Sequence, residues 1–481
     1  MMLPVTGVNF SCDHPQLQKL FDEAEKKCLL NLKQFGNDTV LVEGGGYEKI
    51  WLETQPMGGE MYAKRNMTAA LNNQLLFMRT QREDGRLAGS IQCHPDGSIE
   101  PQFNKFQGFC FPLHALNMWY LTGKDPAYLD QLAHCLEQFD AYLWKTRDTD
   151  HDGCLEAFCV YDTGEDNALR YGKAPVYCTT DTPPVDADVV PMASMDITSF
   201  SYACRATLAE ISRLKGDGQE QAWQEKADQV AKQLKDRLWD EKRHAFFDRD
   251  NQGKVIDVLC HNTLRCMYWG SVTQDMADAF VQEHLLNPKE FWTLMPLPSV
   301  SVSDPAFRNA SENNWSGQSE GLTFQRAIIA LERYGYEPVV TQLGKKLLNA
   351  IIDGGFVFTQ QFDPFTGEPS RVGMVSHEVL TKDSDEPFQD AYGPTMLAAL
   401  EYIAHIWGVH FVGDEVWFSL GSGMTYRYTQ RLGENTYTVA SDGKEASVFI
   451  NEEKILTSPC GVRIVTDHAG KVLRQVTIEE A

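Results

Sequence analysis

Apolar residues recur every three or four positions over most of the first four hundred residues. In the segment 15–32, for example, Leu17, Leu20 and Ala24 fall on one face of a helix. The same spacing predicts further long helices over residues 69–78, 109–121, 128–144, 197–214, 222–238, 322–334, 339–352 and 392–407. With shorter helices near Asn262 and Met276, the pattern predicts about a dozen helices.

Long polar segments separate alternate helices of this series. They span residues 42–64, 94–107, 147–195, 296–320 and 354–391, and they are rich in Trp, Tyr and carboxylate side chains. Long loops of this composition in a compact protein are usually functional. Because each loop follows or precedes a pair of helices, we expect a toroid of helical hairpins with the functional loops at one end.

The pattern changes after about residue 409. Short β-type runs over residues 416–420, 425–428, 436–439, 446–450 and 462–465 alternate with turn sequences such as Asp442-Gly443. The sequence therefore predicts a mainly α fold with two parts. Residues 1–408 form the helical toroid, and residues 409–481 form a small antiparallel, β-sandwich-like domain.

The amino-acid composition argues against two classes of binding partner. The chain has 43 Lys and Arg against 67 Asp and Glu, a formal net charge of −24. Such a chain repels phosphate backbones and anionic lipid surfaces, so neither nucleic acid nor a membrane is an expected partner. No apolar run is long enough to span a bilayer, and the first residues do not resemble a signal peptide. The twelve cysteines are scattered singly, which fits a reducing compartment, so we predict a cytoplasmic protein of open oligomeric state.

Four motifs in a fixed order resemble a known clan of enzymes. Residues 147–153 read R-D-T-D-H-D-G and residues 163–171 read T-G-E-D-N-A-L-R-Y. They resemble the D-x-D-G-D-G-L turn and the G-x-D-N/D-x-x-R segment of glycoside hydrolase family 63 and of the related trehalases, which are six-hairpin glycosidases. Residues 81–86 (Q-R-E-D-G-R), 314–317 (N-W-S-G) and 362–367 (F-D-P-F-T-G) match further family segments, so the resemblance covers roughly residues 65–405.

The resemblance implies an (α/α)6 barrel that hydrolyses an α-glucoside or α-mannoside with inversion. Such hydrolysis needs a carboxylic acid that protonates the leaving oxygen and a carboxylate that activates water on the other sugar face. The family motif places the general acid at Asp166, and Arg170 would position sugar hydroxyls or hold a carboxylate. A solvated capping role for Asp166 and a plain ion pair for Arg170 remain open.

The sequence departs from the family at the general base. Counting back from the F-D-P segment, the family's Glu falls on Gln360, whose amide cannot accept the proton of a water. Glu320 and Glu53 are candidates for a base from another position. Two alternatives stay open: a substitution introduced to trap substrate, and a protein that binds sugar without cleaving it. We favour a working hydrolase with a relocated base.

The loop over residues 44–62 combines aromatic, carboxylate and amide side chains. Sugars stack on aromatic rings while polar groups hold their hydroxyls. We therefore predict a hexose subsite from four side chains of this loop together with Trp315 of the third motif. The four are Trp51, Glu53, Gln55 and Tyr62. The family's W-x-W-D segment is not reproduced here, and a core role for Trp51 is the alternative.

No cofactor is predicted, and the sequence has no H-E-x-x-H pair for a catalytic metal. Asp148, Asp150 and Asp152 imitate the start of a calcium loop, but the twelfth position of that loop is Cys159. A structural calcium held with Glu156 is an alternative to a solvated turn. The expected partner is a small carbohydrate.

Two other functions remain open on the same scaffold. One is a catalytically silent carbohydrate-binding protein, which Gln360 favours. The other is a sugar epimerase or lyase, because helical toroids host these enzymes too. A location of His94, His114 or His261 at the centre of the pocket would favour the epimerase.

Overall fold

The computed structural model describes residues 3–312, 315–381 and 384–480, and in these ranges it contains twelve α-helices. Asn314, at the start of one predicted motif, lies outside the described residues. The helices are α1 Pro15–Cys28, α2 Gln55–Tyr62, α3 Met67–Arg79, α4 Phe111–Leu121, α5 Pro126–Thr146, α6 Met195–Lys215, α7 Glu220–Leu238, α8 Asn262–Trp269, α9 Gln274–Phe280, α10 Gly321–Glu332, α11 Glu337–Asp353 and α12 Gly393–Trp407. A π-helix over Val281–Leu285 continues α9, and short 3₁₀ turns cover Leu29–Asn31, Val160–Asp162 and Leu169–Tyr171.

Local side-chain chemistry sets the helix ends. Asn66 and Ser194 each accept a hydrogen bond from a backbone N–H in the first turn of α3 and α6. Asp125 does the same for α5, whose first residue is Pro126. At its other end α6 stops at Gly216, which has φ +65° and adopts the left-handed conformation that a helix end uses.

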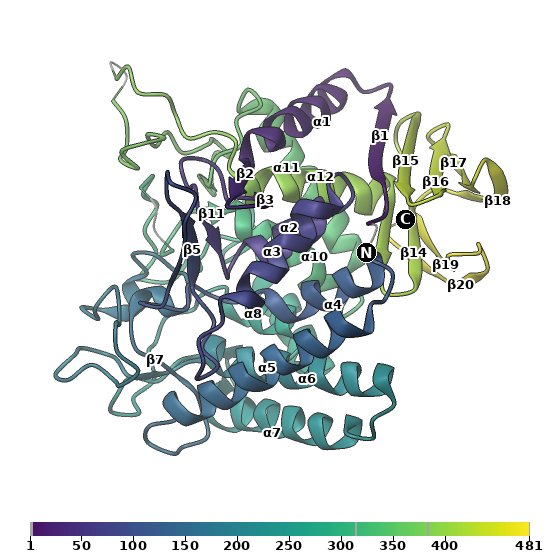
Figure 1. The fold of residues 1–481 in the computed structure, drawn as a ribbon. Helices are drawn as coiled ribbons and strands as arrows, with labels where there is room; N and C mark the ends of the chain where they lie inside the picture. Colours follow the sequence, from purple (N-terminus) through teal and green to yellow (C-terminus); the bar gives the residue numbers. More distant parts are fainter. Residues whose placement is uncertain (1–2, 313–314, 382–383, 481) are drawn as a thin grey trace.

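Six of the helices form a closed cycle of contacts. Helices α2, α4, α6, α8, α10 and α12 touch in that order, and α12 returns to α2. Helices α1, α3, α5, α7 and α11 pack on the outside of members of this cycle (Figure 1). The burial of the side chains agrees with an inner position for α12 and an outer position for α7. Every residue of α12 is buried, whereas α7 buries only one apolar stripe.

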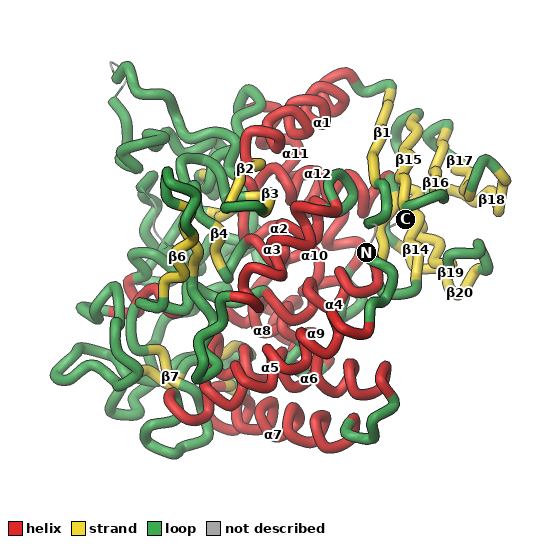
Figure 2. The backbone as a smooth tube through the Cα atoms, viewed as in Figure 1, coloured by secondary structure: helices red, strands yellow, loops and turns green. Residues whose placement is uncertain are grey.

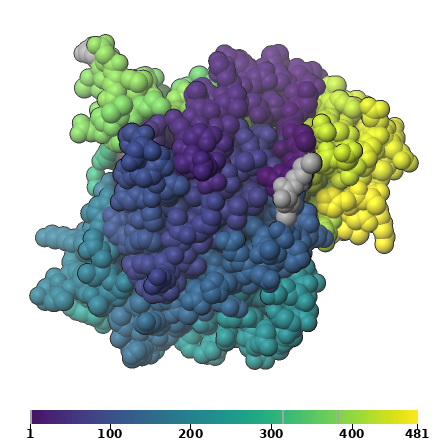
Figure 3. All heavy atoms as spheres, viewed as in Figure 1, coloured from purple at the N-terminus to yellow at the C-terminus, as the bar shows by residue number. Residues whose placement is uncertain are grey.

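The C-terminal strands form two antiparallel sheets at one side of the molecule, which Figure 3 shows as a yellow lobe. One sheet has the order β1-β15-β16-β17-β18 and the other the order β13-β14-β19-β20, and strands of the two sheets contact each other. The strands are β13 Val409–Val412, β14 Glu415–Leu420, β15 Tyr426–Leu432, β16 Asn435–Ser441, β17 Glu445–Ile450, β18 Glu453–Pro459, β19 Val462–Asp467 and β20 Val472–Thr477.

The first strand of the chain was not predicted. Residues Thr6–Cys12 form β1, which pairs antiparallel with β15 and places Phe10 opposite Tyr428. Its sequence, T-G-V-N-F-S-C, is mostly polar and lacks a strong alternation. The strand forms because it pairs with β15, more than four hundred residues later in the chain. A periodic pattern within the segment itself cannot predict a partner at that distance. The N-terminal segment therefore belongs to the sheet of the C-terminal strands.

The loops gather at the end of the helical ring that lies away from these two sheets (Figure 2). Short strands brace them: β2 Leu32–Phe35, β3 Asp38–Leu41, β4 Ile50–Trp51, β5 Ser90–Cys93, β6 Ile99–Gln102, β7 Glu156–Ala157, β8 Met192–Ala193, β9 Trp239–Asp240, β10 Ala245–Phe246, β11 Ser319–Glu320 and β12 Gln361–Phe362. None of the helices in the described ranges combines the length and the apolar character that a bilayer crossing needs.

Candidate active site

A cavity of about 190 Å³ opens among the loops, and its walls come from segments far apart in the sequence. Five side chains singled out from the sequence line it: Trp51, Glu53, Asp166, Trp315 and Gln360. The long loops were thus correctly predicted to supply the side chains of one pocket. Small-molecule sites combine an apolar wall with a few precisely placed polar groups, so the placement of those groups decides the chemistry of this cavity.

Asp166 lies on a tight turn that packs against Glu53 and forms hydrogen bonds with Trp315 and Ser316. Gly164 has φ +74°, and a Cβ at this position would collide with the carboxylate of Glu53, so the close approach of the turn to Glu53 requires glycine. The backbone N–H of Trp315 donates to the carbonyl of Asp166 at 2.9 Å. The Oγ of Ser316 accepts a hydrogen bond from the N–H of Leu169 at 2.6 Å. These contacts fix the turn so that Asp166 faces the cavity.

Glu320 is not among the residues of the cavity wall, and it lies fully buried beside the position of the family's general base. Strands β11 and β12 pair antiparallel and place Glu320 opposite Gln361, one residue after Gln360. The side-chain oxygen of Gln360 accepts a hydrogen bond from the Tyr47 hydroxyl at 3.1 Å, and the Gln360 side chain is close enough to Glu320 to lower the pKa of that carboxyl. The buried carboxyl of Glu320 therefore lies beside the amide that replaces the family's glutamate.

The surroundings of Glu320 favour a protonated carboxyl. Burial raises the pKa of Glu320 well above its usual range, and the charges of Asp166, Glu53 and Glu43 raise it further, while the hydrogen bond from Gln360 opposes them. Like charges close together in a poorly solvated site cannot all be ionised. The cavity therefore holds several carboxyl groups that must share protons near neutral pH.

Two more carboxyl groups belong to this set. Burial raises the pKa of Glu53 to about 7, against the opposing effect of Arg326 and Arg265. The guanidinium of Arg326 contacts Glu53 Oε1 at 2.6 Å, and that of Arg265 lies 3.8 Å away. Glu43 accepts a hydrogen bond from the Tyr392 hydroxyl at 3.1 Å, and burial raises its pKa well above the usual range. Glu53 is thus held by arginines on α8 and α10, whereas Glu43 is held by a neutral hydroxyl.

The raised pKa of Glu320 predicts a pH-dependent stability. Below about pH 4.5 the carboxyl is protonated in both the folded and the unfolded protein. As the pH rises above this value, the unfolded protein releases the proton first, so the free energy of unfolding falls until the pH reaches the higher pKa of the folded protein. Glu320→Gln cannot ionise, so we expect it to raise the unfolding temperature by about 1–3 °C at pH 8 and to leave it unchanged at pH 4.5. Glu283→Gln, at an exposed glutamate, is the matched control in thermal melts.

One wall of the cavity is aromatic and positively charged. The Lys105 ammonium lies 5.2 Å from the ring centroid of Trp51 and 4.9 Å from that of Tyr177. Burial lowers the pKa of Lys105 to about 8, and the nearby Lys49 lowers it further. Lys105 contacts only the Asn104 amide oxygen, at 3.5 Å, among the hydrogen bonds of its ammonium in the described part of the chain. This buried cation therefore lacks a close carboxylate partner.

Two predicted substrate-binding residues of the first loop do not line the cavity. The Gln55 side chain accepts hydrogen bonds from the Trp51 N–H and the Thr54 hydroxyl, and so closes the turn before α2. Tyr62 lies at the far end of α2, where its hydroxyl is buried near Cys28. Tyr62 lies about two helical turns after Gln55, so the two side chains do not face the same pocket although they are close in sequence.

Arg170 also lies beneath the cavity and not in its wall. Its guanidinium pairs with the carboxylates of Glu165, Asp248 and Asp196, all of them buried. Of the two roles considered for Arg170, the structure shows the one that holds carboxylates. Through Glu165, the neighbour of Asp166, this ion-pair network supports the turn that carries Asp166.

Several side chains of the cavity wall were not predicted from the sequence. They are Glu43, Tyr47, Lys105, Gln107, Tyr161, Tyr177, Leu322 and Tyr392. Most lie in loops that were predicted to be functional from their length and composition, so the segments were identified and the individual side chains were not. A buried charge such as Glu43 or Lys105 becomes conspicuous only when the groups around it are visible.

The three histidines that would favour an epimerase lie elsewhere. His94 pairs with Glu100 near the surface at 2.8 Å. His114 is buried between Glu60 and the Tyr268 hydroxyl. His261 is buried near Glu165, and it is not among the residues of the cavity wall. The condition stated for an epimerase is therefore not met.

The acidic turn is close to a calcium-binding arrangement in the structure. One carboxylate oxygen each of Asp148, Asp150 and Asp152 lies within 4.8 Å of the others. Backbone N–H groups of the same turn already donate to all three side chains, and Glu156 accepts two hydrogen bonds from Thr149. A calcium ion there stays a prediction.

Comparisons with known proteins agree with the motifs. Residues 53–379 match the family described as mannosylglycerate hydrolase MGH1-like glycoside hydrolase domain. A mannosylglycerate hydrolase of Rubrobacter radiotolerans is 28% identical over 181 residues, which are 37% of this chain and 40% of that protein. The chain thus aligns with less than half the length of this relative.

Solved structures share the fold at low sequence identity. The GH63 mannosylglycerate hydrolase from Thermus thermophilus, in complex with glucose, superposes with a TM-score of 0.60 at 17% identity, over 80% of this chain and 99% of that one. The neutral trehalase Nth1 from Saccharomyces cerevisiae gives a TM-score of 0.56 at 13% identity, over 80% of each chain. The predicted likeness to family 63 and the trehalases is confirmed, and with its family match over most of its length the chain belongs to the MGH1-like glycoside hydrolases.

Proposed function

We propose that this protein hydrolyses a small α-glucoside or α-mannoside with inversion of configuration. The observation that supports this most directly is that Asp166 lines a cavity with aromatic walls and that its charge acts on Glu320, a buried carboxyl next to the strand that follows Gln360 of the same wall. In an inverting pair the carboxyl groups stand roughly 6.5–9.5 Å apart and admit a water between them and the sugar. Asp166 is the proposed acid and Glu320 the proposed base.

The pair needs one proton before the reaction. The charge of Asp166 raises the pKa of Glu320, so the two groups retain a shared proton over a wide pH range. When the glycosidic bond breaks, that proton must be on Asp166, which gives it to the leaving oxygen. The Glu320 carboxyl, whose raised pKa favours the protonated form, must therefore lose its proton before it can accept one from the attacking water.

The charged wall suggests which leaving group the cavity accepts. Lys105 is a buried ammonium without a close carboxylate in the described part of the chain, so an anionic substrate group would supply a counterion. The relatives are named for a mannoside of glycerate, whose aglycone carries a carboxylate. We infer that the substrate is an α-glycoside with a carboxylate-bearing aglycone and that Lys105 binds this carboxylate.

A substrate screen tests the proposed function. The purified chain is incubated with α-glucosyl and α-mannosyl glycerates and with neutral α-linked disaccharides, and the first product is resolved by NMR. We expect the sugar to be released as the β-anomer. An α-anomer as the first product would contradict the inverting geometry. Tight binding without turnover would instead favour a silent carbohydrate-binding protein, the alternative that Gln360 supports.

Lys105→Met tests the inferred aglycone. Methionine keeps the length and the contact with Trp51 and removes the charge. We expect kcat/KM for an anionic glycoside to fall by about 10–100-fold, which is the loss of one charge-assisted contact, and kcat/KM for a neutral glycoside to change less than about threefold. Equal losses on both substrates would show that Lys105 only supports the wall.

The remaining predictions about architecture and location belong to the same proposal. The closed cycle of six helices with outer partners supports an (α/α)6 toroid within residues 1–408, and the β-sandwich-like part takes in β1 as well as residues 409–481, which corrects the predicted boundary. The proposed cytoplasmic location rests on the acidic composition and on the cysteines that are scattered singly along the chain.

A further inference from the structure

Two histidines and a carboxylate meet at the end of the helical ring that adjoins the C-terminal strands. Glu401 and His405 lie one turn apart on α12, and His410 lies on β13. The Nε2 atom of His405 is 3.7 Å and the Nδ1 atom of His410 is 3.3 Å from Glu401 Oε2. All three donor atoms lie within 4.8 Å of one another. Metal–ligand bonds of about 2.0–2.2 Å place neighbouring ligands of a tetrahedral ion about 3.3 Å apart, close to this spacing.

A second carboxylate orients His405 for metal binding. Its Nδ1 atom lies 2.8 Å from Glu332 Oε1, and Arg463 pairs with the same carboxylate at 2.6 Å. Because Arg463 keeps Glu332 ionised and accepting, Nδ1 of His405 carries the proton and Nε2 presents its lone pair towards Glu401. A histidine held by a carboxylate behind it is the usual support of a metal ligand.

The donor set also has a path to solvent. The Nδ1 atom of His410 is buried, and its nearest charged partner in the described part of the chain is the Glu401 carboxylate at 3.3 Å. His405 and His410 both line a cavity of about 380 Å³ between the ring and strands β13 and β14. An ion can therefore reach the two imidazoles from this cavity, with the buried Glu401 carboxylate directly behind them.

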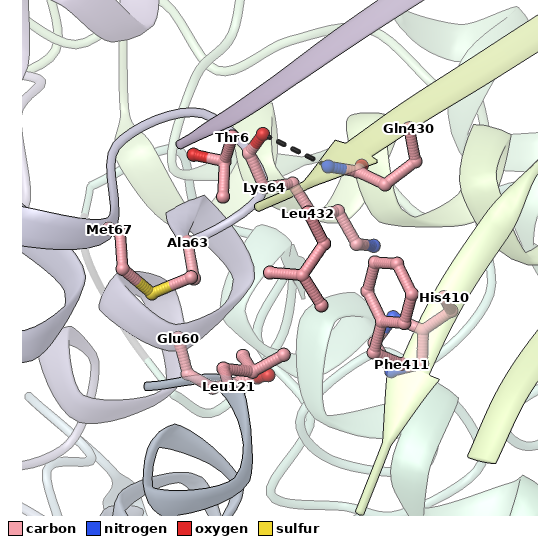
Figure 4. Close-up of a pocket in the computed structure, with 10 residues that line it drawn as sticks. All are labelled: Thr6, Glu60, Ala63, Lys64, Met67, Leu121, His410, Phe411, Gln430 and Leu432. Carbon is pink, nitrogen blue, oxygen red and sulfur yellow. Dashed lines mark hydrogen bonds between the residues drawn. The ribbon is translucent and has the colours of Figure 1, made fainter. Parts of the chain in front are cut away.

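Lys64 is the cation that now balances Glu401. Its ammonium lies 2.7 Å and 2.5 Å from the two carboxylate oxygens, and both side chains are buried. Figure 4 shows Lys64 and His410 in the wall of one further small pocket, Lys64 from the segment after α2 and His410 from β13. Lys64 and a metal ion would compete for the same carboxylate.

We propose that Glu401, His405 and His410 form a binding site for a divalent transition metal of the Zn²⁺ class, which replaces the Lys64 ammonium. Imidazole and carboxylate donors select Zn²⁺, Co²⁺ or Ni²⁺ over Ca²⁺ and Mg²⁺. Tyr392, at the start of α12, lines the active-site cavity, and His405 follows thirteen residues later, about 20 Å along the helix. The metal thus joins α12 to β13 and takes no part in the chemistry at Asp166.

Metal titration of the full chain tests the site. Co²⁺ is added to the purified, chelator-treated protein, and its visible absorption reports coordination by nitrogen and oxygen ligands, while equilibrium dialysis measures Zn²⁺. We expect one ion per chain and an affinity at least about tenfold lower in His410→Ala. His244→Ala is the matched control, because His244 forms a histidine–glutamate pair with Glu283 at the surface. The absence of binding by the natural chain, or equal affinity in His410→Ala, overturns the proposal.

Thermal stability provides a second measurement that does not depend on the folding of one variant. If the metal replaces the ammonium, Zn²⁺ is expected to raise the unfolding temperature of Lys64→Met more than that of the natural chain, because Glu401 then lacks its other cation. An equal or smaller rise contradicts the exchange. His410→Gln replaces His410→Ala if circular dichroism shows that the alanine variant does not fold. None of these variants touches the active-site cavity, so failure here leaves the proposed hydrolase unaffected.

Discussion

Asp166→Asn is expected to lower kcat by about 10³–10⁴-fold while the substrate still binds with a similar Kd. The amide keeps the shape of the side chain and the turn that Gly164 and Trp315 hold in place, but it has no proton to give to the leaving oxygen. General acid catalysis contributes about 10²–10⁴-fold to such reactions. Initial rates and binding isotherms on the substrate found in the screen measure both quantities.

Two controls separate the loss of the acid from a general effect. Asp150→Asn changes the same charge on the same long loop at an exposed position, and we expect it to retain nearly full activity. A glycoside whose leaving group has a low pKa needs no protonation, so Asp166→Asn is expected to hydrolyse it far better than the natural substrate. Equal losses on both substrates would show that Asp166 is not the proton donor.

The local sequence pattern was sufficient for the order of helices and strands. Periodicity located α5, α6 and α12, because each buries a continuous apolar face against the ring. It failed at β1, whose pairing with β15 joins the two ends of the chain. It also extended the first helix too far, since α1 ends at Cys28 and residues 32–35 form a strand of the loop layer.

The candidate site was predictable in part for a related reason. Motif order located Asp166, and chemical reasoning from the amide at Gln360 led to Glu320, because both inferences need only residue types and spacing. Arg170 was assigned from the family motif to sugar hydroxyls or a carboxylate, and Tyr62 was assigned to the sugar from its place in the aromatic loop, but ion pairing and helix geometry take both away from the cavity. The roles of Glu43 and Lys105 depend on which groups lie opposite a buried charge, which is information from tertiary structure alone.

Glu320→Gln tests the relocated base, and its expected effect is a fall in kcat of about 10³-fold or more. The change leaves two amides, at residues 320 and 360, and no carboxylate on strands β11 and β12 to accept the proton of the attacking water. Glu53 does not replace it, because Arg326 and Arg265 hold that carboxylate. Nearly full activity in Glu320→Gln would contradict the assignment and point to Glu43 or Glu53.

The exchange variant Glu320→Gln/Gln360→Glu makes this test sharper. It moves the carboxyl from residue 320 to residue 360, where family 63 has its base, and it keeps the number of charges and amides unchanged. We expect its kcat to return to within about tenfold of the natural chain, since residue 360 lines the cavity and the charges of Asp166 and Glu320 already interact. If instead the exchange variant stays as inactive as Glu320→Gln, the two positions are not equivalent, and the carboxyl must lie at residue 320 itself.

Azide distinguishes a missing base from a damaged pocket. It attacks as an anion and needs no deprotonation, so it is expected to restore turnover in Glu320→Gln and to yield a glycosyl azide of inverted configuration. The same azide is not expected to restore Asp166→Asn with the natural substrate, because the leaving oxygen still requires a proton. Restoration of both variants, or of neither, would contradict the division of roles between these two carboxyl groups. A rescue confined to Glu320→Gln therefore assigns the base and the acid in one experiment.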